Sequence, residues 1–198
     1  LRNHWTMYFD KYSRRKGDDY IKYLLDEHFT ARNVTHPDLE DDRVTLEDID
    51  EYVTNLQKSI RHWFYIHNPY FPESDVSDDQ NKMLLDRMER LGFGAFKPLL
   101  LASYTAQLPI EDINKLLEAT ERYNFTLFSL SKRRANTGDT EFFKLSRDLL
   151  FNQVTIQGII TSINILIDQY YDPEAFLNHI KDRYKIGKDG FYHWDGLR

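Results

Sequence analysis

Between Pro109 and Arg134, apolar residues recur at three- and four-residue spacing, the pattern of one face of a helix. Phe125 and Phe128 add apolar surface away from that face, and a helix that is apolar on most sides is buried by several neighbours. We therefore expect a central helix whose second half lies in the middle of the domain and whose first half lies nearer the surface. The side chains expected to be largely buried are Tyr123, Phe125, Leu127, Phe128 and Leu130.

A second apolar stripe follows a strict alternation of three- and four-residue steps and begins after a capping box at Thr45. It spans three heptads, which is short for a coiled coil, so the pattern favours one helix lying along a bundle. A coiled coil is the alternative. The stripe consists of Leu46, Ile49, Val53, Leu56, Ile60, Trp63 and His67.

The remaining segments also carry helix signals. Ser77, Asp139 and Asp172 each stand where a helix cap is expected, and Pro98 begins a short apolar helix that should be fully buried. Residues 156–170 are rich in isoleucine, so a strand competes with a helix there, but the three- and four-residue spacing favours the helix. Residues 18–29 also read as a helix, and 31–43 as a loop.

These patterns predict an all-α fold. We expect a single helical domain over residues 1–198, built as an irregular bundle of about eight or nine helices around a buried central helix.

Composition narrows the class of protein. The chain has 198 residues, a net charge of −6 and no cysteine, which excludes disulfides and thiolate metal sites and fits a cytoplasmic protein. No apolar run approaches the roughly 20 residues of a membrane span, so we expect no membrane partner. The chain begins at Leu1 and ends at Arg198, and we expect it to be part of a longer protein.

Motifs for catalysis are missing from the sequence. The seven histidines form no HExxH pair, and Gly92-Phe93-Gly94 lacks the lysine of a phosphate-binding loop. Adjacent acid pairs such as Asp78-Asp79 stand at helix starts or in loops, where capping explains them. We therefore expect no catalytic residue, no metal and no cofactor.

Two basic clusters are candidates for DNA contact, since lysine and arginine at the ends of elements make most phosphate contacts. The alternatives are favourable charge at a helix C-terminus and a solvated surface. The first choice is Lys132, Arg133 and Arg134; the second is Arg14, Arg15 and Lys16, with Lys11 beside them.

Several short motifs, in order, resemble one bacterial family, the GmrSD-like modification-dependent (Type IV) restriction endonucleases of phage defence. They are NHWTMYF at 3–9, GDDYI at 17–21, FKPLLLA at 96–102, ERYNF at 121–125, RRAN at 133–136 and GFYHWDGL at 190–197. The chain is similar to the helical middle region of that family.

The resemblance implies a role between two catalytic parts. In that family a ParB/sulfiredoxin-like nucleotide-hydrolysing domain with an Asp-Gly-Gln-Gln-Arg motif comes first, and an HNH nuclease domain comes last. Neither motif occurs here, so the chain is expected to be a non-catalytic module that joins the two and contributes DNA contacts. Trp5 and Trp194 are expected to pack on the helical body where those domains attach.

A different class of function is also open. The heptad stripe and the acidic balance equally suit a helical domain that binds another protein chain or a second copy of itself.

Overall fold

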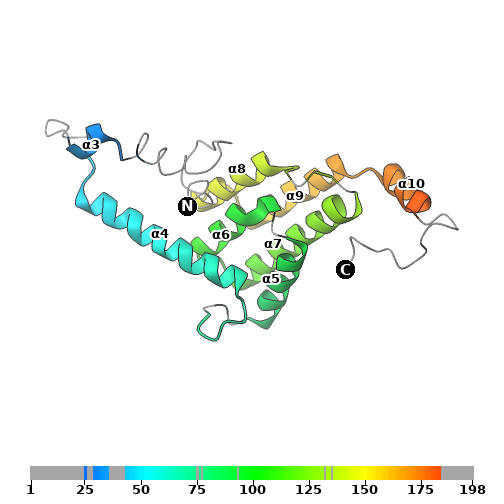
Figure 1. The fold of residues 1–198 in the computed structure, drawn as a ribbon, viewed down its shortest axis with the longest axis horizontal. Coiled ribbons are helices and arrows are strands. Elements are labelled where there is room, and N and C mark those ends of the chain that lie inside the picture. Colours follow the sequence, from blue (N-terminus) through cyan, green and yellow to red (C-terminus); the bar gives the residue numbers. More distant parts are fainter. Residues whose placement is uncertain are drawn as a thin grey trace.

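The structure is a computed structural model that describes residues 25, 29–35, 43–74, 76, 78–92, 94–131, 133–134 and 136–183. Helices dominate this part of the chain and it contains no strand, so the all-α prediction is confirmed. The elements are α3 (Ala31–Thr35), α4 (Leu46–His67), α5 (Asp79–Leu91), η1 (Gly94–Phe96), α6 (Lys97–Thr105), α7 (Ile110–Tyr123), η2 (Asn124–Leu130), α8 (Asp139–Leu150), α9 (Ile156–Tyr170) and α10 (Pro173–Arg183). Figure 1 shows their arrangement.

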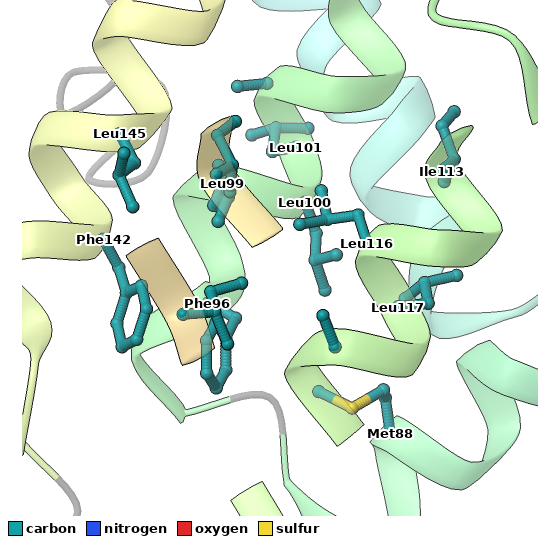
Figure 2. Packing of buried hydrophobic residues seen from close by; sticks show 14 of the residues in the cluster. Met88, Phe96, Leu99, Leu100, Leu101, Ile113, Leu116, Leu117, Phe142 and Leu145 are labelled. Carbon is teal, nitrogen blue, oxygen red and sulfur yellow. The ribbon is translucent and has the colours of Figure 1, made fainter. Parts of the chain in front are cut away.

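Helix α6 is the most completely buried element of the described chain, as its composition predicts. Every residue from Pro98 to Ser103 is buried, because α6 packs against α4, α7 and α8 at once. Its leucines meet apolar side chains of α5, α7 and α8 in the core shown in Figure 2. The labelled members of that core are Met88, Phe96, Leu99, Leu100, Leu101, Ile113, Leu116, Leu117, Phe142 and Leu145.

Helix α7 is the expected central helix, and it lies between α5 and α9. Its first half is deeply buried, with Ile113, Leu116 and Leu117 inside the core. The prediction that this half would lie nearer the surface is therefore wrong. Contact with α5 on one side and α9 on the other leaves only a narrow polar face in solvent.

The second half of the predicted central helix differs from expectation because the helix changes type. From Asn124 to Leu130 the backbone winds as a π-helix, η2, and the Ser131 amide donates to the Thr126 carbonyl five residues earlier. A wider turn changes the positions of the side chains around the helix axis relative to α7. Tyr123 and Leu127 are fully buried as predicted, but Phe125 is 40% exposed and Phe128 and Leu130 are only half-buried.

Helix starts follow the predicted signals with small shifts. Thr45 and Asp48 form the expected capping box, and Asp172 accepts hydrogen bonds from the backbone amides of Glu174 and Ala175. The cap of α5 is Asp78 rather than Ser77, and the cap of α8 is Gly138 rather than Asp139. Residues 31–35, predicted as loop, form α3, where the Thr30 hydroxyl accepts from the Asn33 amide.

Several predictions about packing and secondary structure fall outside the described residues. These are the packing of Trp5, the packing of Trp194, and most of the helix expected over 18–29. The isoleucine-rich segment lies within the described part and is helical: it forms α9.

Candidate functional site

The heptad stripe of α4 is exposed over most of its length, whereas the sequence favoured a helix lying along a bundle; only the C-terminal end of the stripe reaches the body, where Trp63 packs against the core. Within the stripe Leu46 is 85%, Ile49 39%, Val53 43% and Ile60 59% exposed, and Phe64 beside the stripe is 43% exposed. Leu56 and Trp63 are half-buried. Isolated exposed apolar residues are normal, but a contiguous row marks a surface that binds something.

A different face of α4 holds the helix to the body. Ser59, Tyr65 and Ile66 are its buried residues, and Tyr65 Oη donates to the Glu73 carbonyl at 2.8 Å. These residues follow a less regular apolar pattern than the stripe. Tyr65 and Ile66 reach the core because successive residues turn about 100° and so point away from the stripe.

Two further contacts fix the C-terminal half of α4. The ring of His62 stacks on Tyr104 of α6, with centroids 6.4 Å apart. His67 Nδ1 lies 2.7 Å from the Glu89 carboxylate of α5. The C-terminal half of α4 is thereby anchored, and the N-terminal half extends beyond α5–α9 towards α3 (Figure 1).

The extended half of α4 is organised by local contacts. The Asp48 carboxylate accepts from the Thr45 amide at 2.7 Å, and the Asp48 amide donates to the Thr45 hydroxyl. Phe29 packs edge-on against Tyr52, with ring centroids 5.2 Å apart. Neither contact covers Leu46, Ile49 or Val53, which stay exposed.

Charge along α4 is divided between its ends. The N-terminal half carries four exposed acids, and the C-terminal half carries two exposed bases with two histidines. The acids are Glu47, Asp48, Asp50 and Glu51; the bases are Lys58 and Arg61. The surface of α4 therefore combines an apolar stripe with a charge that changes sign along the helix.

A cavity of about 220 Å³ in the described part of the chain also has room for a ligand. It is lined by His62, Tyr65, Val76, Tyr104, Gln107, Leu108, Ile110 and Ile113. Its lining is mainly apolar, and the Tyr104 hydroxyl donates to Asn81 Oδ1 at 2.6 Å. Burial raises the pKa of that hydroxyl, so it stays protonated and acts as a hydrogen-bond donor inside the protein.

Behind Tyr104 runs a chain of buried hydrogen bonds that joins α5 to α7. Asn81 Nδ2 donates to Asn114 Oδ1 at 2.7 Å, and Asn114 Nδ2 donates to Asp78 Oδ1 at 3.0 Å. The hydrogen bond from Asn114, helped by the Asn81 amide, lowers the pKa of the Asp78 carboxyl. Because these groups are paired with one another, the chain of bonds fixes the two helices together.

The first basic cluster is only partly free for DNA. Arg133 Nε donates to the Tyr170 carbonyl at 3.0 Å, at the last residue of α9, where a cation meets the negative helix end. The side chain of Arg134 is exposed. Lys132 lies outside the described residues, as do Arg14, Arg15 and Lys16.

Across the described residues, no group of three or more His, Cys, Asp or Glu side chains is placed to hold a metal ion. The same part of the chain contains no helix that is both long and apolar enough to cross a membrane.

Comparisons of the chain with protein families, with curated proteins and with solved structures each find no match.

Proposed function

We propose that this chain is a non-catalytic helical module that binds other protein domains through α4. The exposed apolar stripe of α4 carries the proposal. From Leu46 to Ile60 the exposed part of the stripe runs about 21 Å along one helix, the length of a short helix-to-helix contact. Covering a row of water-exposed leucine, isoleucine and valine side chains with a partner lowers the free energy.

The core supports this role by holding α4 firmly at one end. Tyr65 and Ile66 are packed into the body, and His67 bonds to Glu89. A partner that covers the stripe is thus set in a fixed direction relative to α5–α9.

The motif resemblance indicates the kind of protein in which such a module would act. In a GmrSD-like restriction protein, the module would join the nucleotide-hydrolysing domain to the HNH nuclease domain. DNA contact through Arg133 and Arg134 belongs to the same proposal, with Arg134 the freer of the two.

A charge placed in the stripe tests the proposal. Val53→Glu puts a carboxylate where an apolar partner surface would lie, and Thr54→Glu adds the same charge at an exposed neighbour off the stripe. We expect Val53→Glu, and not Thr54→Glu, to weaken binding to the protein's partner domains in a titration of the longer protein's separated parts. Equal behaviour of the two variants towards every partner tested would contradict the role of α4.

Nucleotide hydrolysis or DNA cleavage by the purified 198-residue chain would contradict the non-catalytic part of the proposal.

A further inference from the structure

We propose that the cavity beside α4 binds a small, neutral, aromatic molecule of the size of phenol or indole, which carries one hydrogen-bonding group. The cavity lies on the side of α4 that faces the body and not on the exposed stripe, so this inference goes beyond the proposed function and does not depend on it. Four observations carry it: the volume of the cavity, its aromatic lining, its lack of charged side chains, and the backbone of one lining residue.

The cavity has a buried floor and an open mouth. Tyr65, Val76 and Ile113 are buried, whereas Gln107 is exposed and Ile110 is half-buried. A small molecule can therefore enter from solvent at the turn between α6 and α7 and still have much of its surface covered. An apolar cavity of about 150 Å³ is large enough for benzene, so a volume of about 220 Å³ suits a substituted or fused ring.

Aromatic rings form much of the lining, and hydrogen bonds hold them in place. The hydroxyl of Tyr65 donates to the Glu73 carbonyl at 2.8 Å. The hydroxyl of Tyr104 donates to Asn81 Oδ1 at 2.6 Å, and the Tyr104 ring stacks on His62. Both hydroxyl protons are thus used within the protein, and these residues offer a ligand ring surface that is already in position. Because aromatic rings pack favourably on one another, the lining favours an aromatic ligand over an aliphatic one of equal size.

The charge of the ligand follows from the side chains of the lining. Among the described residues that line the cavity, none is an aspartate, glutamate, lysine or arginine. A charged ligand would lose its hydration without gaining an opposite charge, which is costly. The carboxamide of Gln107 brings a hydrogen-bond donor and an acceptor to the same lining. The cavity therefore suits a neutral ring with one polar group.

The backbone of Gln107 is the fourth observation. Its φ is +52°, in the left-handed region. The turn after α6 places it there: the Gln107 amide donates to the Tyr104 carbonyl at 3.0 Å, and the Leu108 amide donates to the Ser103 carbonyl at 3.4 Å. Glycine or asparagine adopts this position after a helix more easily than glutamine does. Backbone strain at a residue that lines a cavity points to a role for its side chain, and here the carboxamide is the group that bonds the ligand.

Methyl NMR of the 198-residue chain, labelled at isoleucine, tests the site with indole as the probe. The signals of Ile110 and Ile113 should shift during the titration, with a dissociation constant of about 0.1–1 mM for a ligand of this size. Ile159 and Ile163, buried in α9, are the internal controls and should not shift. The absence of shifts at Ile110 and Ile113 up to about 5 mM indole, or equal shifts at all four residues, would overturn the inference.

Filling the cavity tests its location. Ile110→Trp adds a large ring to the lining, and Glu111→Trp adds the same ring at an exposed neighbour outside it. With the Ile113 methyl signal as the reporter, Ile110→Trp should weaken indole binding at least about tenfold, and Glu111→Trp should leave it within about twofold. If both variants are folded and bind indole equally, the ligand lies elsewhere and the inference is wrong.

Gln107→Gly separates a role in binding from a role in the fold, and it is expected to fold even if Ile110→Trp does not. Glycine tolerates the positive φ, so the melting temperature should stay the same or rise. Loss of the carboxamide should weaken the binding of phenol about three- to tenfold, the effect of one hydrogen bond. Binding of benzene, which has no polar group, should change by less than about twofold. Equal affinity of Gln107→Gly and wild type for phenol would contradict the assignment of Gln107 to the ligand.

Discussion

Gly138 stands directly against the Tyr123 side chain: a Cβ at position 138 would lie 2.6 Å from Tyr123 Oη and 2.7 Å from Phe142 Cε2. Gly138 also has a φ of +82°, in the left-handed region, where it caps α8. The Tyr123 hydroxyl donates to the carbonyl of the preceding Thr137 at 3.0 Å. The turn at Thr137 and Gly138, before α8, therefore packs directly against the Tyr123 side chain at the end of α7.

Gly138→Ala is expected to lower the free energy of unfolding by about 3 kcal/mol, measured by urea denaturation. Part of the loss is the strain of a side chain at positive φ, and part is the steric contact with two fully buried rings. Those rings cannot move aside easily, since Tyr123 and Phe142 pack edge-on with centroids 5.0 Å apart.

Gly94→Ala is the matched control for Gly138→Ala. Its φ is +48°, but the nearest atom to an added Cβ is Phe128 Cε2 at 3.8 Å, an ordinary contact. We expect a loss of about 1 kcal/mol from backbone strain alone. Equal losses for the two variants would show that the rings yield and that steric contact plays no part.

Asn81→Ala is expected to destabilise the protein by about 3 kcal/mol in the same assay, because it leaves both Tyr104 Oη and Asn114 Oδ1 without their partner in a buried place. Tyr104→Phe is the milder comparison. This substitution removes only the terminal hydrogen bond of the network and should cost about 1–2 kcal/mol. A larger loss for Tyr104→Phe than for Asn81→Ala would show that the ring, and not the hydrogen-bond chain, joins α5 to α7.

Asp78 should make stability depend on pH in the acid range. The hydrogen bond from Asn114 lowers the pKa of this carboxyl in the folded protein, so its contribution is present above the unfolded-state pKa of about 3.9. That contribution is lost as the pH falls through the lower folded-state pKa. The stability difference between wild type and Asp78→Asn, which keeps a capping side chain, should therefore shrink below about pH 4. A difference that stays constant from neutral pH to acid would contradict this assignment.

Much of the fold can be read from local signals. The capping box at Thr45 and the apolar run from Pro98 correctly predict where α4 begins and that α6 is buried, because both depend on neighbours close in sequence. Helix α9 was predicted correctly over a competing strand because its apolar spacing extends through four turns.

The predictions from sequence fail where contacts between distant helices determine which side chains are buried. The sequence cannot show that α4 enters the core through Tyr65 and Ile66, since the heptad stripe beside them is more regular and equally apolar. Nor does it signal the change to a π-helix at Asn124, whose side chain is held by the distant carbonyl of Gly92. Phe125 is exposed because it stands two residues after buried Tyr123, about 200° around the helix.

Arg133 and Arg134 are neighbours with different surroundings, and replacing each by alanine separates a structural role from a DNA-binding one. Arg133→Ala removes the hydrogen bond to the Tyr170 carbonyl and should lower the free energy of unfolding by about 1 kcal/mol. Arg134→Ala removes an exposed side chain and should change stability by less than about 0.5 kcal/mol.

The DNA measurement uses the same two variants. If Arg134 contacts a phosphate, Arg134→Ala weakens binding and reduces the slope of log affinity against log salt by about 0.9, the release of one counterion. Arg133→Ala should affect the slope less, because its Nε is engaged at the end of α9. Titration of DNA at two or more salt concentrations, with the protein carrying each substitution, measures both slopes. Unchanged affinity and slope in the Arg134→Ala protein, with its melting temperature preserved, would exclude this arginine as a phosphate contact.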